Sequence, residues 1–99
     1  MYPINIRFEW DSRKAILNEK KHRVSFIQAM EVFYDPYGLY GLDEEHSLSD
    51  EEREFCIGQT FQGKMILVIF TEREEEVVRI ISARPANKKE HHYYYEKQA

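Results

Sequence analysis

Six cationic side chains in this sequence have the chemistry to act on a phosphodiester: Lys21, His22, Arg53, Arg73, Arg79 and Arg84. Cleavage of RNA by its own 2′-hydroxyl needs a proton acceptor, a proton donor and cations around the charge that develops on phosphorus, and it needs no cofactor. Arginine suits the last role because its planar guanidinium can hold two phosphate oxygens at once. Surface arginines also serve solubility alone, so the residue types by themselves leave both interpretations open.

Other kinds of reactive or cofactor site find little support. The four histidines, His22, His46, His91 and His92, share no metal-ligand spacing with one another or with a cysteine, so we expect no metal site. Cys56 stands inside a predicted strand with no histidine near it in sequence, so it is expected to be a small core residue rather than a nucleophile. The four glycines form no phosphate-binding loop, and we expect no cofactor.

The composition predicts one small domain spanning residues 1–99. The chain is 42% hydrophobic, enough for a packed core, and its net charge of −4 excludes a uniformly basic nucleic-acid coat. A lone cysteine excludes an intrachain disulfide. The longest apolar run, residues 65–70, is too short to span a membrane, and the N-terminus has no signal-peptide pattern. We therefore expect a cytoplasmic protein with no membrane partner.

Charge is segregated along the chain. Residues 13–23 contain five Lys or Arg against one Glu, and residues 84–92 contain three against one, whereas residues 43–54 contain seven acids against one Arg. Each run could be a solvated face. Alternatively, the two basic segments form one surface opposite acidic loops, and such a surface can hold a polyanion because phosphate affinity depends on local contacts.

An N-terminal strand followed by two helices is predicted. Residues 4–10 alternate apolar and polar as a half-buried strand does, and Asp11 suits the N-cap of a helix that runs to about residue 21. The side chains expected to face the core from this helix are Ala15, Ile16 and Leu17. Ser25 with Gln28 forms a capping box that begins the second helix. Its apolar face is Phe26, Ala29, Met30 and Phe33.

The second half of the chain predicts an antiparallel sheet and a final helix. The predicted segments are a short edge strand or acidic loop over 39–50, strands over 52–61, 64–72 and 77–84, and a helix over 86–97. With Gln62-Gly63 as a two-residue turn, Ile57 pairs with Val68, and their face should receive the two helices. The fold class is therefore α+β, with an N-terminal strand and two helices packed on an antiparallel sheet and a C-terminal helix.

The register of the last strand decides where the arginines lie. A turn at Glu74-Glu75 would put Ile80, Ser82 and Arg84 on the second, less covered face of the sheet. Arg84 would then be an exposed cation near Thr60, at the start of the basic C-terminal segment. In the same register Arg53 and Arg79 fall on the helix-covered face, where they could pair with Glu72.

Three motifs follow one another in the chain: Phe8-Glu9-Trp10-Asp11, residues 21–26 (KHRVSF) and residues 79–84 (RIISAR). Shorter matches, His46-Ser47 and residues 71–73, lie between them. Together, over about residues 7–95, they resemble the BrnT family of type II toxins. Each motif alone would carry little information, and their combination in this order is specific.

The resemblance implies a RelE-like fold and an endoribonuclease that blocks translation. It also implies neutralisation by a BrnA-type antitoxin, whose ribbon-helix-helix part binds operator DNA, so that the toxin meets DNA only indirectly. RNA is the implied substrate, and no cofactor is implied. The candidate catalytic residues are Lys21, His22, Arg53 and Arg84. The candidate RNA-binding residues are Trp10, Arg73, Arg79, Lys88 and Lys89.

Alternatives remain open at this point. Trp10 could belong to the core, and Lys21 and His22 could simply favour a helix C-terminus, where the helix dipole stabilises positive charge. Residues 85–92 hold fewer arginines than the stretch they resemble, which favours a second hypothesis, a partner-binding module that keeps the fold without cleaving RNA. A direct DNA-binding regulator is a third hypothesis. The sequence argues against it, because it shows no basic recognition helix.

Overall fold

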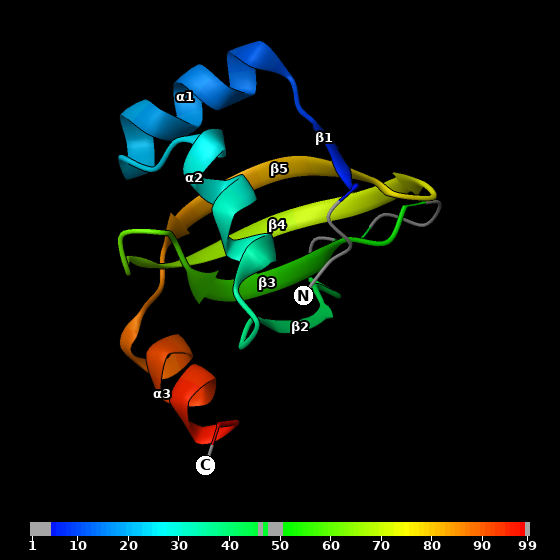
Figure 1. Cartoon of the computed structure of the whole chain (residues 1–99). Coiled ribbons are helices and arrows are strands. Elements are labelled where there is room, and N and C mark those ends of the chain that lie inside the picture. Colours follow the sequence, from blue (N-terminus) through cyan, green and yellow to red (C-terminus); the bar gives the residue numbers. More distant parts are fainter. Residues whose placement is uncertain (1–4, 46, 48–50, 99) are drawn as a thin grey trace.

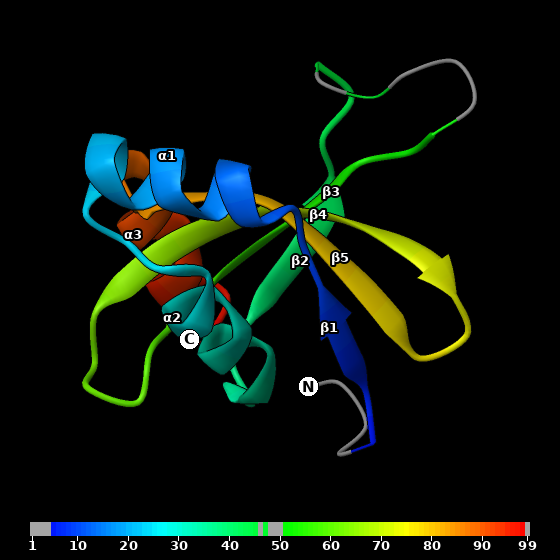
Figure 2. The ribbon, with the colours of Figure 1, turned by 90° about the horizontal axis from the view of Figure 1, so that it is seen from above.

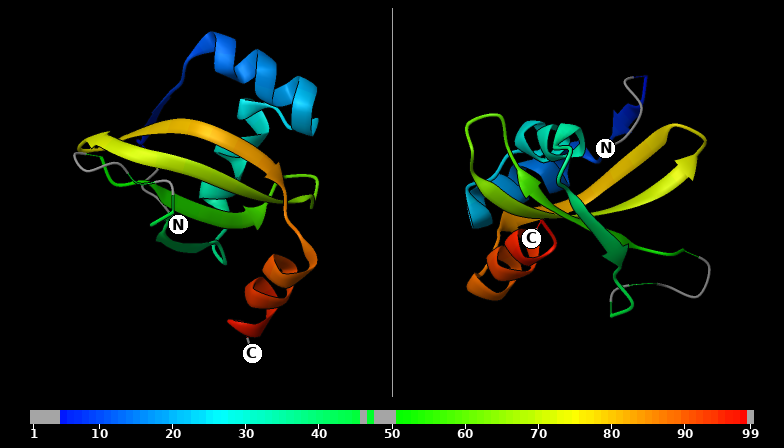
Figure 3. Two further views of the ribbon diagram at one scale, coloured as in Figure 1. Left: turned by 180° about the vertical axis from the view of Figure 1, so that it is seen from behind. Right: turned by 60° about the horizontal axis from the view of Figure 1, so that its bottom comes forward.

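The computed structural model describes residues 5–45, 47 and 51–98. Its elements, in chain order, are β1 (Arg7–Glu9), α1 (Ser12–His22), α2 (Phe26–Glu31), the 3₁₀-helix η1 (Val32–Tyr34), β2 (Leu39–Leu42), β3 (Glu54–Gln59), β4 (Met65–Glu74), β5 (Val77–Pro85) and α3 (Lys88–Glu96). The strands form one sheet in the order β1-β5-β4-β3-β2. Helices α1 and α2 cover one face, and α3 lies against the other (Figure 1, Figure 3).

The predicted α+β class is confirmed, but the sheet is mixed rather than antiparallel. β1 pairs with β5 in parallel, with Phe8 opposite Val78. A strand that pairs with its sequence neighbour through a tight turn must run antiparallel, whereas β1 is separated from β5 by most of the chain and has no such constraint. The ambiguous segment 39–50 begins with β2, which is an edge strand. Residue 4, the predicted start of β1, lies outside the described residues.

The sheet is buried on both faces, each against its own apolar cluster. The larger cluster joins the sheet to α1, α2 and η1 and includes Phe26, Phe33, Ile66, Val68, Phe70 and Ile80. The smaller one joins it to α3 through Ile57, Met65, Leu67 and Tyr94. Burial on both faces explains why residues 65–70 are continuously apolar. Cys56 is a core residue as predicted, and burial raises the pKa of its thiol to about 12, so it stays neutral.

Two predicted helix starts are confirmed, whereas the predicted inner face of α1 is right only for Ala15, which packs against the main core. The Oδ1 of Asp11 accepts from the backbone N–H of Arg13 and Lys14, and Ser25 forms both hydrogen bonds of its capping box with Gln28. In α1, however, the side chains of residues 16 and 17 are 59% and 64% exposed. The buried residue of this helix is polar, and it is Asn18.

Asn18 is buried because its side-chain amide forms hydrogen bonds with backbone groups of β5 that no neighbouring strand pairs. β1 pairs only with the first three residues of β5, which leaves the edge of β5 open beyond them. There the Oδ1 of Asn18 accepts from the N–H of Ala83 at 3.1 Å, and its Nδ2 donates to the carbonyl of Ala83 at 2.8 Å. Nδ2 also donates to the carbonyl of Val24, in the loop after α1, at 3.0 Å. One side chain thus fixes α1 and the following loop to β5.

The predicted register between β3 and β4 is wrong by one residue. Ile57 lies opposite Leu67 rather than Val68. The cause is the hairpin loop, because Thr60 N–H bonds the carbonyl of Lys64 and so encloses three residues instead of two, with Gly63 at φ 84°. A glycine in the left-handed region at the end of a three-residue loop is a common hairpin geometry. The slip moves Ile57 from the helix-covered face to the α3 face.

The predicted turn between β4 and β5 is also wrong. Of the side chains whose face depends on it, some lie on the predicted face of the sheet and others do not. Glu74 pairs with Val77 across the turn, and irregularities in the ladder follow near Glu74 and near Ile69. The irregularity near Ile69 changes which residues of β5 point to each face of the sheet, so that Ile80 lies opposite Phe70 in the main core. Beyond it, residues 82 and 84 keep the predicted face, opposite Ile69 and Leu67 respectively. Figure 2 shows this long hairpin extending past the helices.

A second buried polar contact holds α3 in place. The Oδ2 of Asp35 accepts from the Tyr94 hydroxyl at 2.7 Å and from the backbone N–H of Gln59 at 2.9 Å. Burial, followed by the hydrogen bond to Asp35, raises the pKa of Tyr94. The end of η1, strand β3 and helix α3 therefore meet at one carboxylate.

We expect Asn18→Ala to lower the free energy of unfolding by about 1–3 kcal/mol, because it leaves backbone groups of Val24 and Ala83 buried without a partner. Urea unfolding followed by circular dichroism measures the change. Leu17→Ala is the matched control on the same helix, since that side chain is exposed and its removal should change little. Equal midpoints for Asn18→Ala and the wild type would show that the network is not stabilising.

Candidate functional site

A groove of about 520 Å³ lies on the α3 face of the sheet. It is bordered by the last residue of α1, the end of β5, the first turns of α3 and the connection after β2. Its lining residues are His22, Asp43, Glu45, Phe55, Ile57, Leu67, Ile69, Ser82, Ala83, Arg84, Glu90 and Tyr93. Two predicted catalytic residues, His22 and Arg84, therefore share one groove.

The Asn18 network explains how His22 and Arg84 come together. Asn18 and His22 are four residues apart on α1 and so lie on the same side of that helix. Because Asn18 binds the backbone of Ala83, the last turn of α1 is fixed beside the neighbouring Arg84. The juxtaposition is thus a consequence of a buried amide and does not depend on any attraction between the two side chains.

Arg84 is half-buried and forms an ion pair, contrary to the prediction of an exposed cation near Thr60. Its Nη1 and Nη2 donate to the two carboxylate oxygens of Glu90, each at 2.8 Å, and Nη1 also donates to the carbonyl of Pro85. The hydrogen bond to Glu90 raises the pKa of Arg84. Burial alone would raise the pKa of Glu90, but the hydrogen bonds from Arg84 and from the Asn87 N–H lower it overall.

Glu90 also begins helix α3. Its Oε1 accepts from the backbone N–H of Asn87, and the Asn87 side chain accepts from the N–H of Glu90, which completes a capping box. One carboxylate therefore connects the end of β5 to the first turn of α3. The sequence carries the signal for it, Asn87 followed three residues later by Glu90, whereas its pairing with Arg84 depends on the tertiary structure.

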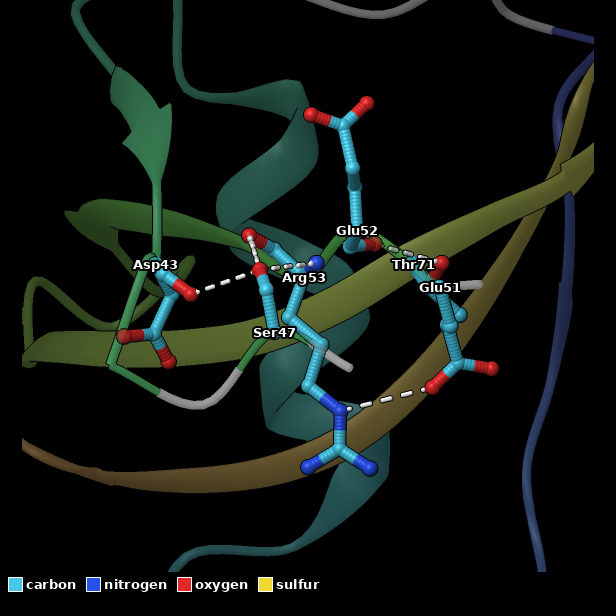
Figure 4. A network of polar contacts seen from close by, with 6 residues as sticks. All are labelled: Asp43, Ser47, Glu51, Glu52, Arg53 and Thr71. Carbon is cyan, nitrogen blue, oxygen red and sulfur yellow. Dashed lines mark hydrogen bonds and ion pairs between the residues drawn. The ribbon is translucent and has the colours of Figure 1, made fainter. Parts of the chain in front are cut away.

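Arg53 lies outside the groove lining, in the polar network shown in Figure 4. Its Nε pairs with Glu51 at 3.4 Å, and its backbone N–H donates to Ser47 Oγ at 2.9 Å. Ser47 Oγ donates in turn to the carbonyl of Asp43, whose own N–H bonds the Arg53 carbonyl. This network shapes the loop that carries the acidic end of the groove. His46, the other half of the motif at 46–47, lies outside the described residues.

Three predicted RNA-binding residues lie elsewhere. Arg79 pairs with Glu9 of β1 at 2.8 Å, and alternation along β5 puts it on the face away from Val78, so both its predicted face and its predicted partner are wrong. Trp10 packs against the main core, edge-on to Phe26 at 5.9 Å between ring centres. Arg73 is exposed near the far end of β4.

The remaining predicted cations lie on the same two helix ends as His22 and Glu90 but outside the groove lining. Lys21 is exposed in the last turn of α1, and Lys88 and Lys89 are exposed in the first turn of α3. Figure 1 shows these two helix ends at the same end of the sheet. Lys89 Nζ lies 5.8 Å from the ring centre of Tyr93, a groove residue that the sequence did not single out.

Within the described part of the chain, neither a cluster of metal-ligating side chains nor a membrane-spanning helix is found. Residues 5–45, 47 and 51–98 contain no group of three or more His, Cys, Asp or Glu arranged to hold a metal ion. Among the same residues, no helix has the length and apolar character needed to cross a membrane.

Comparisons with known proteins agree on one family. Residues 10–90 match the family model described as "Ribonuclease toxin, BrnT, of type II toxin-antitoxin system". Among solved structures, the chain is similar to the Brucella abortus ribonuclease toxin BrnT, with 26% sequence identity and a TM-score of 0.62 over 84% of this chain and 99% of that one. No curated protein matches the sequence.

The geometry of the ion pair predicts that Arg84→Ala and Glu90→Gln each lower the free energy of unfolding at neutral pH by about 1–2 kcal/mol. Because the pKa of Glu90 is lowered in the folded state, its contribution is complete above the ordinary glutamate pKa of about 4.3 and is lost as pH falls through the lowered value. The difference between wild type and Glu90→Gln should therefore shrink on acidification.

Urea unfolding at a series of pH values measures both effects. Glu96→Gln is the matched control on α3, since its pair with His92 is largely exposed and should contribute about 0–0.5 kcal/mol. A difference between wild type and Glu90→Gln that stays constant down to acid pH would contradict the assignment.

Proposed function

The chain belongs to the BrnT family of ribonuclease toxins of type II toxin–antitoxin systems, and from this premise we propose that it is an endoribonuclease whose active site is the groove of His22 and Arg84. We further propose that cleavage proceeds by attack of the ribose 2′-hydroxyl without a metal ion, and that it blocks translation. The observation that carries the proposal is the common groove of these two side chains.

The two residues have complementary chemistry for this reaction. Imidazole exchanges protons near neutral pH, so His22 suits the transfer of a proton to or from the reacting oxygens. Arg84 suits the stabilisation of negative charge that builds on the phosphorane. Ser82, also in the groove, offers a hydroxyl that can donate to a phosphate oxygen.

Arg84 keeps a donor edge for phosphate although it is bound by Glu90. The pair occupies the end of the guanidinium formed by Nη1 and Nη2. The side edge, formed by Nε–H and the second N–H of Nη2, donates to no described residue. Two parallel donors on this edge match two phosphate oxygens, and the clamp of Glu90 holds them in a fixed direction.

The other predicted residues enter the proposal at different positions. Exposed Lys21, Lys88 and Lys89 lie on the helix ends that carry His22 and Glu90, outside the groove lining, and would bind the RNA backbone on either side of the cut. Arg53 would contact RNA beside the groove, on the far side of the loop that contains Asp43 and Ser47. Arg73 and Arg79 would contact only RNA that extends beyond the groove. Trp10 packs in the core, so its contribution to RNA binding would be indirect.

We expect Arg84→Ala to slow RNA cleavage by about 10²–10³-fold, and Arg84→Lys to recover only part of that loss, because lysine keeps the charge but not the fork. His22→Gln should fall in the same range. Single-turnover cleavage of one RNA, with and without a chelator, measures these rates. Arg13→Ala is the control, since this exposed cation lies on the outer side of α1 and should cleave at the wild-type rate.

Unfolding curves of the same proteins separate catalysis from stability, since the rates are compared well below each melting temperature. Equal rates for wild type, Arg84→Ala and Arg84→Lys would remove Arg84 from the site, and rates that fall in chelator would exclude a metal-independent reaction. Intact RNA with the wild type would favour the second hypothesis, a partner-binding module.

For the partner, we propose a BrnA-like ribbon-helix-helix antitoxin that binds operator DNA, so that this chain meets DNA only through it. The outer side of α1 supports such an interface. Ile16 and Leu17 are exposed there, on the helix that also carries exposed Arg13 and Lys20. Exposed apolar side chains among cations suit a partner segment that is apolar and acidic.

The dissociation constant of the antitoxin complex should therefore increase with salt, since exposed charge pairs are screened over about 8–10 Å at physiological ionic strength. Replacing Arg13 and Lys20 together by Ala should reduce this salt dependence. Isothermal titration at low and high salt tests both. An unchanged dissociation constant would exclude electrostatic docking on α1.

A further inference from the structure

We propose that the groove binds a single guanosine nucleotide of the RNA, with its phosphate at Arg84 and the base edge at the carboxylates of Asp43 and Glu45. The inference rests on the proposed function, because it names the substrate that this site selects. It predicts that the protein recognises guanine at the cleavage site.

The two ends of the groove differ in charge, because the Arg84 guanidinium, paired with Glu90, lies at one end and two further carboxylates lie at the other. Arg84 and His22 border it at the end of β5 and α1, whereas Asp43 and Glu45 border it beyond β2. An RNA backbone running along the groove would be repelled by the two carboxylates at the second end, because it carries a negative charge at every phosphodiester. One nucleotide does not, because its negative charge is confined to the phosphate and its base carries only neutral hydrogen-bonding groups.

The floor between the two ends is apolar. Ile57 and Leu67 are almost fully buried and Ile69 is half-buried. Phe55 and Tyr93 add aromatic surface, and Tyr93 remains 44% exposed. A nucleobase fits such a floor, because its faces are apolar and stack on aromatic side chains, and single-stranded RNA is commonly recognised in this way.

The floor of the groove runs diagonally across the sheet. Arg84 lies opposite Leu67 and Leu67 opposite Ile57, so the floor crosses from β5 through β4 to β3. Adjacent strands are about 4.8 Å apart, which makes this crossing about 10 Å. The β2 residue opposite Ile57 is Leu39, whereas the carboxylates follow Leu42 at the other end of β2, so the floor continues along Ile69 and Phe55 toward them. A phosphate at Arg84 would thus leave the base over the floor with its outer edge toward the carboxylates.

Guanine is the base whose edge matches carboxylates best. Its N1–H and N2–H₂ groups are adjacent donors that can bind the two oxygens of one carboxylate. Adenine and cytosine offer an amino group beside a ring acceptor, which a carboxylate repels, and uracil offers a single N–H between two carbonyls. Matched bidentate pairs of this kind discriminate strongly between bases.

The test is an NMR titration of the full chain with the 3′-monophosphates of guanosine, inosine and uridine. Guanosine should bind about tenfold more tightly than uridine, and inosine, which lacks the N2 amino group, should lose most of that advantage. Glu45→Gln and Asp43→Asn should each reduce the preference, whereas Glu44→Gln should keep it. Glu44 is the matched control, since it lies between the two acids, is exposed and does not line the groove.

The outcomes separate the inference from the proposed function. A guanosine preference that depends on Glu45, in a protein that leaves RNA intact, supports the nucleotide site and refutes the ribonuclease. Cleavage of RNA together with equal binding of guanosine and uridine overturns the inference and keeps the ribonuclease. Equal effects of Glu45→Gln and Glu44→Gln also overturn it, and unchanged spectra away from the groove show that the variants remain folded.

Discussion

The buried amide of Asn18 is the contact on which the site depends. It fills the part of the β5 edge that β1 does not reach, and it satisfies both backbone groups of Ala83 as a neighbouring strand would. A helix could pack on this sheet in many orientations by apolar contact alone, because apolar packing is not directional. Hydrogen bonds to one backbone position remove that freedom, and so the end of α1 meets the end of β5 at a defined place.

Other joints of the molecule use the same device, a polar side chain bound to the backbone of a distant segment. Asp35 accepts from the N–H of Gln59 and from Tyr94, and Ser47 connects two sides of the acidic loop. Glu90 caps α3 while it clamps Arg84. Each joint lies where an element ends. The groove is bounded by such ends, so these few hydrogen bonds fix the positions of its borders.

Local signals predicted the elements well and predicted their relative placement poorly. The capping box at Ser25 and the alternation of the strands depend on neighbours in sequence, and both are confirmed. The prediction that Ile16 and Leu17 face inward from α1 was wrong because it followed apolarity, whereas the orientation of this helix depends on the bond of Asn18 to a strand edge far away in the chain. Strand register was wrong because one extra loop residue before Lys64 reverses every side chain of β3.

The same limit applies to the candidate site. The resemblance to BrnT toxins gave Arg84 and His22, which share the groove. It could not give Glu90 as the partner of Arg84, because that pair forms only when α3 folds back beside β5. Asp43 and Glu45 read in the sequence as part of an acidic run, and nothing local distinguishes them from Glu44. Only the tertiary structure separates acids that line a groove from one that faces solvent.

The proposed action of an acidic chain on RNA raises a question of charge, which the arrangement of the groove addresses. The net charge of −4 opposes the approach of a polyanion as a whole. Affinity for one phosphate, however, depends on the few donors that touch it, and Arg84 keeps an edge for that purpose. In the proposed nucleotide site, the carboxylates elsewhere in the groove would serve recognition, because they would select a base by its N–H donors and disfavour a second phosphate in the groove. A site of this kind would have low general affinity for RNA and high selectivity for one nucleotide, which is the property that the proposed cleavage at guanosine requires.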